Sequence, residues 1–349
     1  MRIDRSVAAA MGAAVLFGLS TPLAKTLVDG VAPLLLAGLL YVGSGLGLAM
    51  ILAARLATRG TASISWPRGS DVVWLLGAIV AGGAVGPFLL MYGLRATDAA
   101  SASLILNLEG VVTALLAWFV FKENFDRRIA VGMALIVAGG VVLSAAPVIQ
   151  VGGFVGPLAI AGACIAWAID NNLTRKVSIH DAMFIACTKG LVAGFANVAL
   201  ALSGGASLPA AFTVAQAGAL GFVGYGLSLT LFVVALRGLG TARTGAYFSL
   251  APFIGAGLAV ALGSPITLSL VMAGLLMAAG VWLHLTEHHE HAHRHAAAAH
   301  DHEHSHDAHH AHEHGPEWDG SEPHSHAHVH APLTHVHAHY PDVLHRHDH

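Results

Sequence analysis

Residues 106–143 read LNLEGVVTALLAWFVFKENFDRRIAVGMALIVAGGVVL, two long apolar runs joined by the short charged connector KENFDRR. A helix that crosses the hydrocarbon core of a membrane needs about 20 mostly apolar residues. Extended to 98–121 and 127–146, both runs reach that length, and neither has the polar face that a helix on a soluble protein carries. The stretch therefore predicts two membrane-spanning helices, over 98–121 and 127–146.

The same pattern recurs along most of the chain. Apolar runs of this length lie at 6–28, 31–54, 72–94, 98–121, 127–146, 154–173, 182–202, 214–236, 241–262 and 266–285. The first run lacks a convincing cleavage site, so we interpret it as a span and not as a signal peptide. The expected fold class is an all-α integral membrane protein with ten transmembrane helices.

Charge divides the chain into an apolar body and a tail. Residues 1–283 hold 15 Lys and Arg against 9 Asp and Glu, whereas residues 284–349 hold 2 against 11, together with 24 of the 25 histidines. Basic residues in short loops mark the cytoplasmic side of a membrane. Twelve of them fall on the side of both chain ends, and only Lys25 and Arg95 fall on the other. Both termini, and the tail with them, are predicted to be cytoplasmic.

The body contains an internal repeat. AAVLFGLSTPLAK (13–25) aligns with ACIAWAIDNNLTR (163–175) at an offset of 150, which places Phe17 on Trp167. Residues 94–118 align with 236–260 at an offset of 142. A repeat of five spans is odd, so the second copy would enter the membrane from the opposite face, an arrangement suited to alternating access. The predicted domains are 1–147, 148–285 and the tail, 286–349.

The body resembles the drug/metabolite transporter superfamily, of the kind with two EamA domains. The resemblance rests on LFGLSTPLAKTL (16–27), on residues 106–143 and on FSLAPFIGAGLAVALGSPITLSLVMAGLLMAAGVWL (248–283). It implies ten helices in an inverted five-plus-five arrangement around a central cavity, and export of metabolites, amino acids or toxic compounds. Two departures leave the coupling mechanism open. Glu109-Gly110 stands where the family often has a proline, and Glu123 has no counterpart in the second half.

Ionisable and polar residues inside the spans are candidates for the site, because burying a charge in a membrane costs at least about 2.5–3.5 kcal/mol on insertion scales. Glu109 lies near the predicted middle of its span, beside Asn107, and is a candidate for proton coupling or substrate binding. The alternative is a structural ion pair, either Glu109–Lys189 or Asp170–Lys189. The candidate residues for substrate binding or coupling are Glu109, Asn107, Lys189, Asp170, Asn171, Asn172, Ser20, Thr21 and Trp167.

The tail carries no apolar period and contains four prolines, so it is predicted to be disordered. Its repeated H-x-H spacing offers many exchangeable imidazole ligands, which would hold Zn, Ni, Co or Cu loosely and not in one closed site. The candidate metal ligands are His300, His302, His304, His306, His309, His310, His312, His314, His324, His326, His328, His330, His335, His337 and His339.

Two functional hypotheses follow. The first is a secondary transporter of the inner membrane that exports a small solute, a metabolite, amino acid, drug or metal, with no required cofactor. The second is a membrane-tethered divalent metal buffer or sensor in which the tail has the main role. No nucleophile and base occur together as an enzyme requires. The expected partners are the lipid bilayer and a small molecule or ion, without nucleic acid, and a homodimer is left open.

Overall fold

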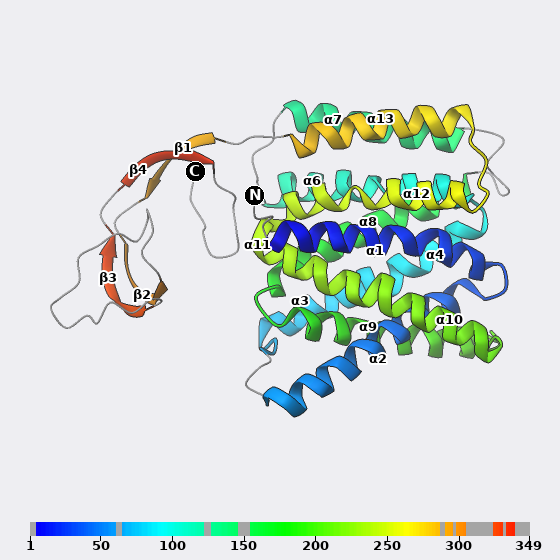
Figure 1. Ribbon diagram of the computed structural model, residues 1–349, viewed down its shortest axis with the longest axis horizontal. Helices are drawn as coiled ribbons and strands as arrows, with labels where there is room; N and C mark the ends of the chain where they lie inside the picture. The colour runs from blue at the N-terminus through cyan, green and yellow to red at the C-terminus, as the bar shows by residue number, and fades with distance from the viewer. Residues whose placement is uncertain are drawn as a thin grey trace. The chain divides into compact units, whose positions relative to one another are not determined.

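The computed structural model describes residues 5–60, 65–121, 127–145, 154–286, 290–295, 298–304, 324–330 and 333–338. The chain divides into a helical unit within residues 1–287 and a second unit within 288–340, and each is described by itself. Figure 1 labels most of the elements of both.

The described part of the first unit is helical throughout, apart from connectors. Its elements are α1 (Arg5–Val28), α2 (Pro33–Arg59), α3 (Ser70–Ala78), η2 (Ile79–Val85), α4 (Gly86–Arg95), α5 (Ala99–Ile105), α6 (Leu108–Phe121), α7 (Arg127–Ala145), α8 (Val155–Val177), α9 (Ala182–Ser203), α10 (Ala211–Gly221), η3 (Phe222–Leu227), α11 (Ser228–Phe248), α12 (Ala251–Ala261) and α13 (Leu268–Leu285).

Local sequence explains several helix ends. The Asp98 carboxylate accepts hydrogen bonds from the backbone N–H groups of Ala100 and Ser101 and caps α5. Asp181 caps α9 and Thr267 caps α13 in the same way. Such caps satisfy N–H groups that have no partner inside the helix. Gly240, with φ of 74°, interrupts α11, because a glycine adopts this backbone conformation without steric cost.

Six helical stretches are long and apolar enough to cross a membrane: Arg5–Val28, Pro33–Thr58, Ser70–Arg95, Ala182–Ser203, Ala211–Thr241 and Thr244–Ala261. The apolar helices at Ala99–Thr113, Ala130–Leu143 and Leu268–Leu283 are shorter. Large apolar side chains lie exposed on the helical unit, among them Phe212 at 74% and Leu268 at 76%, as a lipid-facing surface requires. The all-helical, multi-pass membrane body is confirmed for the described residues, whereas the number of ten spans stays a prediction.

The helices run roughly parallel or antiparallel to one another (Figure 1), with α7 beside α13 and α2 beside α9. Glycines allow the closest of these approaches. A Cβ atom built on Gly190 of α9 would lie 2.6 Å from the backbone nitrogen of Gly45 in α2. Small residues at such crossings let helix backbones come together, which is how packing stabilises helix pairs in a membrane.

Two long helices contain a wider, π-helical turn. The segment η2 separates α3 from α4, and η3 separates α10 from α11. A π-helical turn leaves backbone groups without their usual partners, and such turns occur frequently at functional sites. Two further breaks occur at Leu106–Asn107, between α5 and α6, and at Ser249–Leu250, between α11 and α12.

In the second unit, the structure describes strands where the sequence predicts disorder. They are β1 (Glu290–His295), β2 (Ala298–His304), β3 (His324–His330) and β4 (Leu333–Ala338), paired antiparallel as β1–β4 and β2–β3. The H-x-H pattern repeats every two residues, which is also the side-chain repeat of a strand. The prediction of disorder rested on the missing apolar period and the four prolines, and it stays a prediction.

Candidate substrate pocket

A pocket lies inside the helical unit between helices that are far apart in the sequence. It has about 460 Å³ of empty space, including its open mouth. The lining residues come from α1, α2, α6, α8, η3 and α11, and they are Phe17, Tyr41, Glu109, Trp167, Asp170, Asn171, Gly224, Tyr225, Ser228, Leu229, Phe232 and Phe248. Phe17 and Trp167 are each the thirteenth residue of their helices. At 1.5 Å per residue this is about 18 Å from the helix start, near mid-membrane depth.

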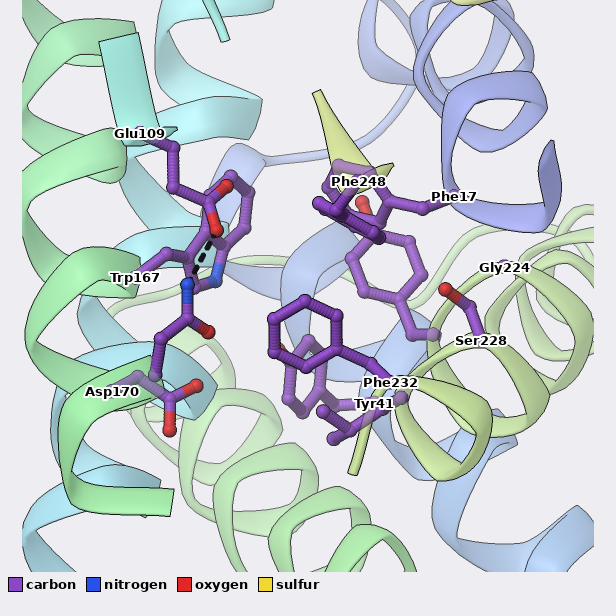
Figure 2. A pocket seen from close by; sticks show the side chains of 12 residues that line it. Phe17, Tyr41, Glu109, Trp167, Asp170, Gly224, Ser228, Phe232 and Phe248 are labelled. Carbon is purple, nitrogen blue, oxygen red and sulfur yellow. Dashed lines mark hydrogen bonds between the residues drawn. The ribbon is translucent and has the colours of Figure 1, made fainter. Parts of the chain in front are cut away.

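The polar groups gather on one side of the pocket. Figure 2 shows Glu109, Trp167 and Asp170 on this side. The Asn171 side-chain amide donates a hydrogen bond of 2.7 Å to Glu109 Oε1, drawn as the dashed line. Among the side chains that the structure describes, Glu109 has no ion pair with a Lys or Arg. Glu109 therefore brings a carboxyl group to the pocket that only a neutral amide contacts.

Asp170, by contrast, already has a positively charged partner. Lys189 Nζ lies 2.5 Å from Asp170 Oδ1 and 3.2 Å from Thr174 Oγ1, and Thr174 Oγ1 itself donates to Asp170 Oδ1 at 2.8 Å. The Lys189 side chain is fully buried and does not line the pocket. Of the two ion pairs that the sequence left open, the structure forms Asp170–Lys189.

The opposite side of the pocket is aromatic. Figure 2 shows Phe17, Phe232 and Phe248 facing the carboxylates across the cavity, with Tyr41 below Phe232. Phe17 contacts Trp167 edge to face, with ring centroids 5.6 Å apart, and Tyr225 at 5.7 Å. These contacts fix the rings in edge-to-face and tilted arrangements, which their charge distribution favours.

The segment η2 holds part of this wall in place. The Tyr41 hydroxyl and the Trp167 indole N–H both donate to the Gly82 carbonyl, at 2.7 and 3.0 Å. Asn197 donates to the next carbonyl, that of Gly83, at 3.2 Å. Carbonyls that the π-helical turn leaves available are thus satisfied by side chains from three other helices, as an apolar environment demands.

The structure brings together four of the nine residues predicted for the site, Glu109, Trp167, Asp170 and Asn171, at the pocket wall. Lys189 supports the pocket from behind through Asp170. The other four do not line it, and they are Asn107, Asn172, Ser20 and Thr21. Two of these, Ser20 and Asn172, donate to carbonyls of their own helices, those of Phe17 and Ala168.

Most of the aromatic wall is missing from the sequence-based prediction. Tyr41, Tyr225, Phe232 and Phe248 were not selected, nor was Phe17, although the repeat aligned it with Trp167. That alignment was the available signal. A second pocket of about 330 Å³ shares Phe17, Glu109, Asn171 and Phe248 with the first, so Glu109 lies at the junction of two cavities.

Polar contacts link segments far apart in the sequence at one end of the bundle. Arg55 at the end of α2 pairs with Asp181 at 2.6 Å, and Asp71 pairs with His180 Nε2 at 2.8 Å. Arg237 of α11 donates to the carbonyls of Ser178 and His180. This cluster, which we call the end network, connects the region around α2 and α3 with the α8–α9 connector.

The predicted metal ligands divide between described strands and residues outside them. His300, His302 and His304 lie in β2, His324, His326, His328 and His330 in β3, and His335 and His337 in β4. His306, His309, His310, His312, His314 and His339 lie outside the described residues. Among the residues that are described, no group of three or more His, Cys, Asp or Glu converges to hold a metal ion.

Comparison with known proteins agrees with the resemblance drawn from the sequence. Residues 5–145 match the EamA-like transporter family. Over 287 residues the chain is 27% identical to an uncharacterized transporter of Methanothermobacter thermautotrophicus. The aligned region covers 78% of this chain and 83% of that protein. Over 206 residues it is 23% identical to the uncharacterized transporter YyaM of Bacillus subtilis, with 55% and 66% covered.

One solved crystal structure has the same fold. It superposes on 80% of this chain and 96% of its own with a TM-score of 0.62, at 22% sequence identity. Together, these similarities confirm the resemblance to the drug/metabolite transporter superfamily.

Proposed function

We propose that the protein is a secondary transporter that moves a small solute across the inner membrane by alternating access. The match of residues 5–145 to the EamA-like transporter family supports this proposal. The observation that carries this proposal is the pocket, which lies deep among membrane helices and is lined from both halves of the body. The family and the named relatives are transporters, which agrees with a role other than catalysis. The solute class, whether metabolite, amino acid, drug or metal, is not fixed by the family.

Several matched features support an inverted repeat of residues 1–147 and 148–285, and with it ten spans. Gly82 of η2 and Gly224 of η3 are 142 residues apart, the offset found in the sequence. A Cβ on Gly82 would meet Asp170, and a Cβ on Gly224 would meet Ser20, 150 residues before Asp170. Equivalent glycines thus contact equivalent positions in the other half. Two such halves can rock around a site between them.

The distribution of basic residues supports cytoplasmic chain ends. The end network contains Arg55 and Arg237, which belong to the predicted cytoplasmic loops. It joins the first predicted half to the second, so it would hold the halves together on the cytoplasmic side. Breaking and re-forming these contacts would open and close that side during transport.

Glu109 is the proposed coupling residue. It is 9% exposed, lies at the junction of the two cavities and has only the Asn171 amide as a hydrogen-bond partner in the described residues. A carboxyl group in this position can release a proton when solute binds and take one up when solute leaves. A proton gradient would then drive solute out of the cytosol.

The test uses purified protein in liposomes that enclose a pH-sensitive dye, with radiolabelled amino acids, amines, drugs, Zn²⁺ and Ni²⁺ as the solute panel. Glu109→Gln removes the exchangeable proton and keeps the side-chain shape. We expect this variant to lose gradient-driven accumulation and to keep solute exchange at equal pH on both sides. The matched control, Asp29→Asn, changes an exposed carboxylate after α1 and should behave as wild type. Accumulation that survives Glu109→Gln contradicts the coupling role.

A second candidate function is metal buffering by the tail, favoured by the register of the strands. In the pair β2–β3, His300 lies opposite His328, and His302 lies opposite His326. In the pair β1–β4, His293 lies opposite His335. The backbone register therefore pairs several histidine positions across each strand pair. Neutral imidazole binds Zn, Ni, Co and Cu.

Deleting residues 286–349 tests this second function. A buffer would lose most of the Zn²⁺ or Ni²⁺ bound per chain in equilibrium dialysis, and cells with the truncated protein would tolerate less metal. A matched variant that changes the tail histidines to Asn keeps its length and polarity. Unchanged metal tolerance in both variants contradicts the metal function and leaves the transporter proposal intact.

A further inference from the structure

We propose that the pocket binds a singly charged organic cation with an apolar body, such as an organic amine. This inference rests on the proposed transport function and names the class of solute at the same site. It follows from the charges that face the cavity and from the rings that surround it.

The charge facing the pocket is negative. Two acidic residues line it, Glu109 and Asp170, and among the side chains that the structure describes no Lys, Arg or His does so. Asp170 is neutralised by Lys189 at 2.5 Å, which leaves the Glu109 carboxylate as the net charge. A buried carboxylate is costly unless a cation approaches it. One positive charge on the solute therefore balances the pocket.

An anionic or zwitterionic solute meets no cationic partner among the described lining side chains. Lys189 is fully buried behind Asp170, and its Nζ is already bonded to Asp170 and Thr174. A solute carboxylate would lie beside Glu109, and no positive side chain lines the cavity in the described part of the chain. Like charges at short distance in an apolar medium repel strongly. The geometry thus selects amines over amino acids and carboxylic acids.

The aromatic wall fits the same solute. Its rings belong to Phe17, Tyr41, Tyr225, Phe232 and Phe248, and Trp167 adds a sixth ring from the carboxyl side of the pocket. The polar atoms of Tyr41 and Trp167 are bonded to the Gly82 carbonyl, so the ring carbons are what these two residues offer to the cavity. Aromatic rings attract an ammonium group through the negative charge on their faces, more strongly where water is excluded. They also pack against an apolar body.

A divalent metal ion fits this wall poorly. Metal ions of this kind need several oxygen, nitrogen or sulfur ligands around them. One of the two carboxylates is engaged with Lys189, and most of the remaining surface is ring carbon. The carboxyl side and the aromatic side stand opposite each other (Figure 2), which suits a molecule with a charged end and an apolar end.

The test measures binding separately from transport. Three probes share one phenyl body: phenethylamine is a cation, phenylalanine is a zwitterion and phenylpropionate is an anion. Calorimetry on the purified full-length protein in detergent gives the dissociation constant of each. We expect phenethylamine to bind about tenfold or more tightly than the other two, since only it gains a charged partner without a repulsion.

Two variants with matched controls show which residues are responsible for the binding of phenethylamine. Glu109→Gln should weaken phenethylamine binding about tenfold, whereas Asp29→Asn, at an exposed carboxylate, should not change it. Phe232→Leu, at a ring 5% exposed, should weaken it several-fold, whereas Phe195→Leu, at a ring 55% exposed, should not. Thermal unfolding of each variant shows whether it is folded. If a variant is misfolded, the comparison of the three probes on the wild-type protein still tests the inference.

The outcomes separate this inference from the transport function. Phenylalanine or phenylpropionate binding as tightly as phenethylamine overturns the inference, and so does the absence of binding by all three. Phenethylamine that binds but does not cross liposome membranes contradicts transport and leaves the cation site standing. Transport of a zwitterion that Glu109→Gln does not affect contradicts the cation site and leaves the transporter intact.

Discussion

Phe17 and Trp167, which the sequence repeat aligns at an offset of 150, contact each other edge to face with ring centroids 5.6 Å apart and planes at 86°. Residues that are equivalent in two related units meet where a two-fold axis passes between the units. Both rings line the pocket, and each is the thirteenth residue of its helix. The proposed solute site therefore lies where the two predicted halves meet.

The hydrogen bonds to the Gly82 carbonyl allow a double-mutant test of the wall. Trp167→Phe alone should cost about 1 kcal/mol of stability, because the Tyr41 hydroxyl still satisfies that carbonyl. Tyr41→Phe alone should have a similar effect. The double variant leaves the carbonyl without either donor and should cost more than the sum of the two, by about 1 kcal/mol. Thermal unfolding in detergent measures all three, and strict additivity would contradict the shared role of this carbonyl.

The buried ion pair predicts a rescue. Lys189→Met leaves Asp170 without its cation and should destabilise the fold by about 3–5 kcal/mol. Adding Asp170→Asn removes the unpaired charge and keeps a group that Thr174 can contact, so the double variant should recover most of the loss. The measurement is the fraction of protein that remains monodisperse after heating. A double variant no more stable than Lys189→Met would show that the pair does not stabilise the bundle.

The apolar helices and several of the polar site residues could be predicted from the sequence. A charge inside a membrane is costly, so Glu109 and Asp170 stand out in the sequence by themselves, and both line the pocket. The partner of Lys189 could not be predicted, because two acidic residues were available and only packing decides between them. The structure forms the pair with Asp170.

The aromatic wall could not be found in the same way. Phe232 and Phe195 both stand in apolar helices, yet one is 5% exposed in the pocket wall and the other 55% exposed on the outside. The sequence alone does not show whether a phenylalanine faces the pocket or the lipid, since an aromatic ring packs well in both environments. Ser20 shows a different case, because it stays a predicted site residue but does not line the pocket. Its hydroxyl bonds to the Phe17 carbonyl in its own helix, which satisfies a polar group in a membrane without any ligand.

The close approach of Asp170 to η2 makes Gly82 sensitive to substitution. A Cβ atom at Gly82 would lie 1.8 Å from Asp170 Oδ2, so Gly82→Ala must move α8 or break the contact with Lys189. We expect a loss of roughly 1–3 kcal/mol from overpacking, together with weaker solute binding. Gly257→Ala is the matched control, because nothing lies within 4 Å of a Cβ there. Thermal unfolding of both variants checks this, and equal stability would contradict the packing of η2 against α8.

The end network predicts a change in the conformational equilibrium. Asp181→Asn keeps the cap of α9, because an Asn oxygen also accepts from the Phe184 N–H, but it removes the charge that pairs with Arg55. A partly exposed pair of this kind contributes about 0.2–1 kcal/mol. If the pair forms only when the cytoplasmic end is closed, losing it shifts the population toward the open state by up to about fivefold.

Alkylation of one cysteine in the pocket measures that shift. Ser228→Cys, combined with Cys164→Ala and Cys187→Ala, places a single thiol among the lining residues. In membrane vesicles whose cytoplasmic face is outward, a membrane-impermeant maleimide should react several-fold faster when Asp181→Asn is added. Asp29→Asn, after α1 and away from the end network, should leave the rate unchanged. If the maleimide reacts at the same rate with the Asp181→Asn and Asp29→Asn variants, the Arg55–Asp181 pair persists in the open state. Closure of the predicted cytoplasmic end would then depend on other contacts.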